Sequence, residues 1–269
     1  MNSNIAVGEI VEVLSVSKTA VTENYVRGGD VTYVISAVNS GSTPLTGVSI
    51  TDDLGGYTFG GGTLYPLAYV VGSVRVYVNG VLQISSPTVV EGPPIVFSGL
   101  TVPASGNLML IYEARVNQFA PLGADDSIVN TAAVTASGIT APSTASATVT
   151  PDASGALTIT KSIDPVSVTE NGTVTYTFII QNYGSGAATA EDEVSVRDTF
   201  NPILSDISVS LNETALAVTE GYTYDQATGT FVTVPGVITV PAATFVRDTA
   251  TGAWTVTPGV TRLTVTGTL

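Results

Sequence analysis

The sequence of 269 residues contains no cysteine and no histidine. Without cysteine the chain can form neither disulfide bonds nor thiolate metal sites. Without histidine it lacks the most common general base, the Ser-His-Asp triad and the most common zinc ligand. Carboxylate pairs can still catalyse reactions, but these absences lead us to expect that the protein is not an enzyme and uses no cofactor.

Basic residues are scarce as well. Eight Lys and Arg stand against 22 Asp and Glu, so the formal net charge is −14. Binding to nucleic acid needs a basic patch, so we expect no nucleic-acid partner, and anionic membrane surfaces are disfavoured for the same reason. No apolar run approaches the ~20 residues of a spanning helix, so we expect no membrane span. The N-terminus also lacks the basic and apolar regions of a signal peptide.

Apolar residues, by contrast, are abundant. Hydrophobic residues make up 44% of the chain and charged residues 11%, and the mean hydropathy is +0.38. Disordered chains combine low hydrophobicity with high charge, so this composition indicates folded domains. The high hydropathy also suggests that a partner covers part of the apolar surface.

Two long segments of the chain, Lys18–Asp52 and Lys161–Asp198, resemble each other and begin 143 residues apart (161 − 18). In both, the lysine precedes the tyrosine of a Val-Thr-Tyr triplet by 15 residues (33 − 18 and 176 − 161), and an Asn-x-Gly turn follows. A repeat of this length predicts two tandem domains rather than a solenoid. The predicted parts are an N-terminal tail (1–8), domain 1 (9–150), a linker (151–155) and domain 2 (156–269).

No window of the sequence has a helical period, whereas several alternate as half-buried strands do. Asp30–Asn39 and Thr173–Asn182 are the clearest of these strands. Asn79-Gly80 and Asn212-Glu213 lie between strand-like runs and predict two-residue hairpin turns. The expected fold class is therefore all-β, with two tandem immunoglobulin-like or prealbumin-like Greek-key β-sandwich domains.

The order of these motifs resembles the repeat family known as domain of unknown function 11. The likeness is carried by the lysine, the Val-Thr-Tyr strand, the Asn-x-Gly turn, a strand ending in Asp, and Asn130-Thr-Ala-Ala-Val134. That family looks like immunoglobulin-type or prealbumin-like sandwiches of bacterial and archaeal surface proteins, and it also resembles repeats of clostridial spore appendages. The resemblance implies an extracellular place on a cell or spore surface, but a fold alone does not give a function.

The two copies end differently. Domain 1 continues for about 35 residues (117–151) beyond the last strand that domain 2 contains. We therefore expect domain 2 to lack at least one terminal strand and to expose a strand edge and an apolar groove. The N-terminal tail resembles the missing strand, Val129–Val134. The candidate donor-strand residues are Ser3, Asn4, Ile5, Ala6 and Val7.

Donation of this strand to the next copy would build a head-to-tail homopolymer. The sequence thus predicts a structural, pilus-like subunit of an extracellular or spore-surface filament. Its main partner is another copy of itself, and other surface or spore-coat proteins are further potential partners. The alternative is a surface adhesion module that recognises glycan or protein through its loops, and a truncated gene product with a frayed tail would leave the same pattern.

The chain has two lysines, at matching positions of the two domains. In the pilin-like sandwiches of Gram-positive bacteria, which this layout resembles, a first-strand Lys can condense with a last-strand Asn beside a buried acid. A second reading is that both lysines lie at solvated strand edges, where they oppose edge pairing. The isopeptide candidates that the resemblance implies are Lys18, Asp52 and Asn130 in domain 1, and Lys161, Asp198 and Asn4 of a neighbouring copy in domain 2.

Acidic pairs offer weak candidates for calcium binding through loop oxygens. These are Asp52, Asp53, Asp125 and Asp126. No spacing in the sequence matches a known calcium loop, so we expect no metal site and interpret the pairs as solvated turns.

Overall fold

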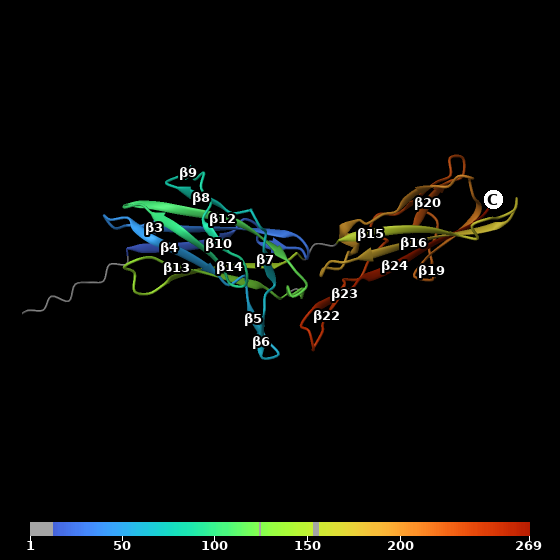
Figure 1. Ribbon diagram of the computed structural model, residues 1–269. Helices are drawn as coiled ribbons and strands as arrows, with labels where there is room; N and C mark the ends of the chain where they lie inside the picture. Colours follow the sequence, from blue (N-terminus) through green and yellow to red (C-terminus); the bar gives the residue numbers. More distant parts are fainter. Residues whose placement is uncertain (1–12, 124, 153–155) are drawn as a thin grey trace, which may run out of the picture. The chain divides into compact units, whose positions relative to one another are not determined.

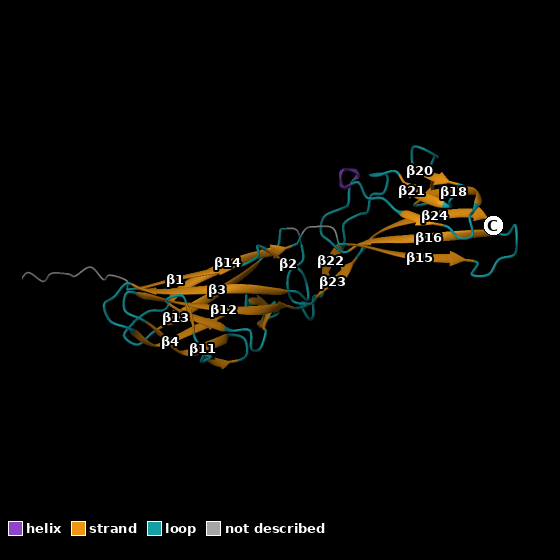
Figure 2. Ribbon diagram, turned by 90° about the horizontal axis from the view of Figure 1, so that it is seen from above, coloured by secondary structure: helices purple, strands orange, loops and turns teal. Residues whose placement is uncertain are grey.

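The computed structural model describes residues 13–123, 125–152 and 156–269. Contacts divide the chain into two units. Domain 1 runs to Pro151 and includes Arg247–Trp254, and domain 2 contains Asp152–Val246 and Thr255–Leu269. The regular secondary structure of the described residues consists of strands joined by loops and turns, with one 3₁₀ turn, Ala190–Asp192 (Figures 1 and 2), so the all-β prediction is confirmed. None of the helical structure in these residues has the length and hydrophobicity needed to cross a bilayer.

Domain 1 is a sandwich of two sheets. The first sheet has the order β1-β3-β12-β8-β9, with β7 also paired to β12, and the second has the order β10-β11-β4-β13-β14-β2. The strands of the first sheet are β1 (Leu14–Ala20), β3 (Asp30–Asn39), β7 (Leu67–Tyr69), β8 (Arg75–Val78), β9 (Val81–Leu82) and β12 (Gly106–Val116). Those of the second are β2 (Asn24–Tyr25), β4 (Leu45–Asp52), β10 (Thr88–Val90), β11 (Ile95–Val102), β13 (Ile128–Thr135) and β14 (Ser143–Pro151), and β5 (Tyr57–Phe59) and β6 (Gly62–Leu64) form a separate hairpin.

Alternation of buried and exposed residues explains these strands. In β3 the residues Val31, Tyr33 and Ile35 are at most 1% exposed, whereas the residues between them are less buried. Side chains on a strand point to opposite faces in turn, so one face of β3 supplies the core. The predicted hairpin turn at Asn79-Gly80 joins β8 to β9, and both residues have the positive φ angles (48° and 78°) that a type I′ turn requires.

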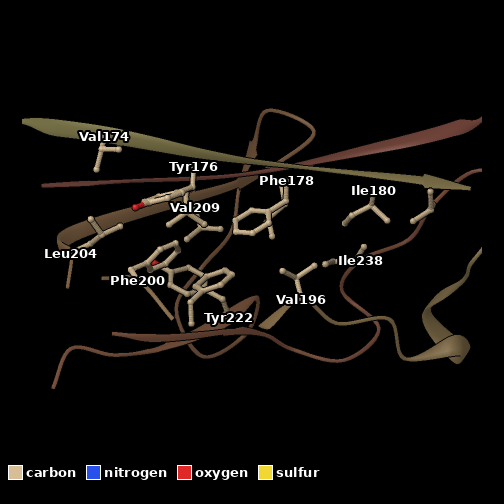
Figure 3. Close-up of a cluster of buried hydrophobic side chains, with 14 of the residues drawn as sticks. Val174, Tyr176, Phe178, Ile180, Val196, Phe200, Leu204, Val209, Tyr222 and Ile238 are labelled. Carbon is tan, nitrogen blue, oxygen red and sulfur yellow. The ribbon is translucent and has the colours of Figure 1, made fainter. Parts of the chain in front are cut away.

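Domain 2 is a smaller sandwich. Its sheets have the orders β15-β16-β24-β18-β19 and β17-β21-β20. A hairpin pairs β22 with β23, and its turn end, Arg247–Trp254, is grouped with domain 1. The strands are β15 (Leu157–Asp164), β16 (Thr173–Asn182), β17 (Arg197–Thr199), β18 (Ser205–Leu211), β19 (Thr214–Ala215), β20 (Tyr222–Asp225), β21 (Thr230–Thr233), β22 (Thr244–Arg247), β23 (Trp254–Thr257) and β24 (Gly259–Thr268). Figure 3 shows its core, where Phe178 and Ile180 of β16 point toward Val196 and Phe200.

The sequence repeat is also a repeat of local structure. Asn39 and Asn182 end the strands β3 and β16, and each accepts a hydrogen bond at 2.9 Å from the main-chain N–H two residues later. Each also donates from Nδ2 to a main-chain oxygen four residues later, at 2.8 and 2.7 Å. These buried Asx turns explain why an asparagine occupies this position in both copies.

The structure differs from the sequence-based boundaries in two places. Pro151, predicted as the first residue of the linker, is the last residue of β14 and pairs with Tyr25. The segment Arg247–Trp254 groups with domain 1 although it lies far along the chain, inside the stretch assigned to domain 2. The local amino-acid composition could not predict either boundary, because both depend on contacts between residues that are distant in sequence.

Candidate functional site

Four strands of domain 1 bring polar side chains into its core. Lys18 lies on β1 and Tyr112 on β12 of the first sheet, and Asp52 lies on β4 and Asn130 on β13 of the second. Each holds an inward position in its strand; Asp52, for example, follows the buried Val48 and Ile50 on one face of β4. All four residues are at most 5% exposed. The structure thus brings together the three candidates Lys18, Asp52 and Asn130 and adds Tyr112, and we refer to these four residues as the buried cluster.

Asp52 is the centre of the buried cluster. Its Oδ2 atom lies 2.6 Å from Lys18 Nζ and accepts a hydrogen bond of 2.6 Å from the Tyr112 hydroxyl. Its Oδ1 atom accepts a hydrogen bond of 3.1 Å from the main-chain N–H of Leu54. The Tyr112 oxygen in turn accepts a hydrogen bond of 3.0 Å from Asn130 Nδ2. A continuous path of hydrogen bonds therefore runs from the lysine amine to the asparagine carboxamide.

Burial sets the protonation of this cluster. Burial lowers the pKa of the Lys18 ammonium, and the carboxylate of Asp52 opposes that change. Burial also raises the pKa of the Tyr112 hydroxyl well above its ordinary value, and the nearby charge of Asp52 acts in the same direction. A buried amine with a lowered pKa is easier to deprotonate, and only the neutral amine is a nucleophile.

A second tyrosine borders the cluster. The rings of Tyr33 and Tyr112 stack with their centroids 5.6 Å apart, and Lys18 Nζ lies 4.8 Å from the centroid of the Tyr33 ring. Among the described residues, the Tyr33 hydroxyl and Asn130 Oδ1 are buried polar atoms without a well-formed hydrogen bond. Burial raises the pKa of the Tyr33 hydroxyl, and the nearby side chain of Asn130 opposes that rise. No sequence motif indicates Tyr112, because domain 2 has Val265 at the matching position, and Tyr33 belongs to the repeated Val-Thr-Tyr triplet without a further signal.

Domain 2 contains half of the same arrangement. Lys161 on β15 forms an ion pair with Asp198 on β17, and its ammonium lies over the rings of Tyr176 and Phe200, at 4.6 and 5.4 Å from their centroids. The two charged side chains are 39% and 19% exposed, whereas both partners of the pair in domain 1 are 0% exposed. Because Val265 faces Tyr176 as Tyr112 faces Tyr33, domain 2 has no hydroxyl at the position of Tyr112.

Domain 2 also has no described strand at the positions of β13 and β14. In domain 1, β4 pairs with β11 on one side and β13 on the other, whereas β17 pairs only with β21 among the described strands. All eight residues of β15 are exposed. Three of them, Leu157, Ile159 and Ile163, share a face with Lys161 and are 37%, 53% and 38% exposed. We refer to the free edge of β17, the apolar face of β15 and the Lys161–Asp198 pair together as the open face.

The remaining predicted residues are placed differently. Asp53 accepts hydrogen bonds from the main-chain N–H groups of Gly55 and Thr131, and Asp126 accepts one from Gly123. Asp125 is exposed, and no group of three or more acidic residues in the described ranges is placed to hold a metal ion. The isopeptide candidate Asn4 and the donor-strand residues Ser3, Asn4, Ile5, Ala6 and Val7 lie outside the described residues.

Alkaline pH tests the protonation of Tyr112. An unfolded tyrosine loses its proton near pH ~10, whereas the raised pKa keeps Tyr112 protonated in the folded domain. The folded state then binds more protons, so the stability from this group is complete below pH ~10 and is lost as the pH rises further, by about 1.4 kcal/mol per pH unit. Urea titrations between about pH 8 and 11 should show a steeper loss for the wild type than for Tyr112→Phe, and parallel curves would contradict this.

No family model matches this chain, and no curated protein matches it either. The major pilin subunit BcpA of Bacillus cereus is a structural neighbour with 12% identity and a TM-score of 0.39, over 93% of this chain and 66% of that one. The pilus backbone protein RrgB of Streptococcus pneumoniae has 10% identity and a TM-score of 0.37, over 91% and 55%. The collagen-binding domain of a Staphylococcus aureus adhesin has 12% identity and a TM-score of 0.34, over 52% and 97%. Likenesses at this level assign neither a family nor a function to the chain.

Proposed function

We propose that the protein is a structural subunit of a filament on a cell or spore surface. In this proposal an N-terminal strand of one copy enters domain 2 of the next. The observation that carries it is the contrast between β1 and β15, which pair in the same register with β3 and β16. Leu14 is 1% exposed, whereas its counterpart Leu157 is 37% exposed. The same sequence position is therefore covered in domain 1 and left open in domain 2.

The open face suits an added strand. One edge of β17 has no partner among the described strands, so its main chain can bond to an incoming strand as β4 bonds to β13. Alternate side chains of that strand would then enter the space between the sheets. Covering Leu157, Ile159 and Ile163 even partly contributes about 1 kcal/mol for each side chain.

The proposed occupant is the segment of residues 3–7 of a second copy. Its Asn4-Ile5-Ala6 has the same spacing as Asn130-Thr131-Ala132 of β13. In domain 1, Ala132 lies opposite Asp52 in the register of β13 and β4. The same register would place Ala6 opposite Asp198 and direct Asn4 toward the ion pair of domain 2.

This donor and acceptor give the assembly a direction. In domain 1 the positions of the missing strands are filled by β13 and β14, so a donated strand has no matching place there. Each copy thus offers one tail and one open face on different parts of the chain. A contact between different surfaces of identical copies is heterologous, and it extends into a fibre unless the rotation closes a ring.

Within domain 1, we propose that Lys18 and Asn130 form an amide bond beside Asp52. Such a bond would join β1 to β13 and close a loop of more than a hundred residues, which reduces the conformational freedom of the unfolded chain. Condensation of an amine with a carboxamide releases ammonia. The intact mass of domain 1 would therefore be lower than the sequence mass by one ammonia molecule.

Electron microscopy of two proteins tests the filament proposal. The full chain of 269 residues should form regular filaments, and a variant that lacks residues 1–8 should stay monomeric by light scattering. Adding a synthetic peptide of residues 1–12 should protect amides of β17 in the shortened variant from hydrogen exchange without restoring filaments. A full chain that remains a monomer, or filaments of the shortened variant, would contradict donation by the tail.

A further inference from the structure

We infer that Tyr112 passes a proton to the leaving nitrogen of Asn130 when the Lys18–Asn130 amide forms. This role rests on the cross-link proposed above and adds a catalytic residue to it. The sequence motifs assign no role to Tyr112, and its place becomes evident only when β12 and β13 are seen on facing sheets.

The hydrogen bonds of the buried cluster carry this inference. The carboxamide nitrogen of Asn130 becomes the leaving group, and it donates a hydrogen bond of 3.0 Å to the Tyr112 hydroxyl. That hydroxyl donates to the same oxygen of Asp52 that lies 2.6 Å from the lysine amine. The proton that Lys18 must lose and the proton that Asn130 must gain are thus at the two ends of one path.

The step balances along this path. Lys18 gives a proton to Asp52, and its neutral Nζ atom forms a bond to Cγ of Asn130. The Cγ–Nδ2 bond breaks as Tyr112 gives its proton to Nδ2 and takes the proton held by Asp52. Nζ then loses a second proton to Asp52, which passes it to the ammonia, so the products are a secondary amide and an ammonium ion, and Asp52 is again a carboxylate. No oxidant or reductant is required.

Two observations favour Tyr112 over direct transfer from Asp52. First, no hydrogen bond joins Asp52 to Asn130 among the described residues, so the carboxylate reaches the leaving nitrogen through the tyrosine. Second, Asp52, Tyr112 and Asn130 are 0% exposed, which keeps bulk water from serving as the acid. The raised pKa of Tyr112 disfavours a free tyrosinate, so it must take up one proton as it releases the other.

Domain 2 provides a comparison inside the same chain. Val265 holds the position of Tyr112 there and can pass no proton. An asparagine on a donated strand would therefore lie beside Lys161 and Asp198 without a hydroxyl to relay the proton from the aspartate to its nitrogen, the role that we call the relay. We therefore expect the contact between copies, in which the donated strand lies in domain 2, to stay non-covalent during the time in which the Lys18–Asn130 amide forms in domain 1.

The experiment compares two Tyr→Phe variants, each of which lacks one buried hydroxyl. Full-length wild type, Tyr112→Phe and Tyr33→Phe are purified in denaturant and refolded by dilution, and the loss of ammonia is followed by intact mass. General acid–base catalysis contributes about 100-fold or more, so Tyr112→Phe should react at least ~100 times more slowly than the wild type. Tyr33→Phe should stay within a few-fold, because no hydrogen bond joins the Tyr33 hydroxyl to Asp52 among the described residues and it therefore lies outside the path from Lys18 to Asn130.

The outcomes separate the relay from the cross-link. A wild type that never loses ammonia overturns both proposals. The relay is overturned, and the cross-link stands, if the wild type loses ammonia and Tyr112→Phe loses it at the same rate. The same conclusion follows if Tyr33→Phe is slowed as much as Tyr112→Phe. If circular dichroism shows that Tyr112→Phe does not fold, the wild-type rate in mixtures of light and heavy water decides. Two protons moving together give a curved dependence on the deuterium fraction, and a linear dependence overturns the relay.

Discussion

Asp52→Ala is expected to lower the free energy of unfolding of domain 1 by about 3–5 kcal/mol, because it leaves the ammonium of Lys18 buried without its counter-ion. The lysine and aspartate side chains are both 0% exposed, so water cannot take over the lost interaction. The Tyr112 hydroxyl and the Leu54 amide also lose their acceptor. Differential scanning calorimetry measures the effect as a shift of the domain 1 transition, and the loss grows further if the amide bond no longer forms.

Asp198→Ala is the matched control in the other domain. It removes the same carboxylate from the same position of the repeat, but its partner Lys161 is 39% exposed and can be solvated. Ion pairs with this access to water contribute about 0–1 kcal/mol, so the domain 2 transition should hardly move. Equal losses in the two domains would contradict the conclusion that burial by β13 and β14 makes the difference.

The contrast between these two aspartates shows what a sequence can and cannot reveal. Lys18, Asp52 and Asn130 could be found in the sequence because each takes a fixed place in a repeated or family-like motif. Tyr112 could not, because its strand has Val265 at the matching position and offers no repeat to compare. Its role depends on hydrogen bonds to residues on facing strands, which no local pattern encodes.

Burial is the other property that the repeat conceals. Lys18 and Lys161 occupy the same position relative to their Val-Thr-Tyr strands, yet one is enclosed and the other is partly open to solvent. The enclosing strands β13 and β14 lie about a hundred residues further along the chain than β1. The sequence could predict that domain 2 has no counterpart of β13, and none is found among the described strands. Which side chains are more exposed as a result follows only from the pairing of the sheets.

The register of the proposed joint has a testable consequence in residues 5 and 6. If Asn4 takes the place of Asn130, then Ala6 takes the place of Ala132, which is 0% exposed, and Ile5 takes the more open place of Thr131. Ala6→Glu would force a charge between the sheets and should abolish filaments, since burying an unpaired carboxylate costs several kcal/mol. Ile5→Glu should leave filaments intact in spite of removing the larger apolar side chain.

The opposite pattern is equally informative, because a shift of one residue exchanges the two faces of a strand. Filaments that survive Ala6→Glu and disappear with Ile5→Glu would show that Ile5 and Val7 face the core of domain 2. Asn4 would then point away from Lys161 and Asp198, and the parallel with β13 would be wrong although the tail is still the donor. Pelleting assays and electron microscopy of the two variants at equal concentration distinguish these registers. Loss of filaments with Ala6→Glu alone would indicate that the open face binds the tail through the carboxamide and the small residue of Asn-x-Ala. Loss with Ile5→Glu alone would indicate that it binds the tail through the larger apolar side chains.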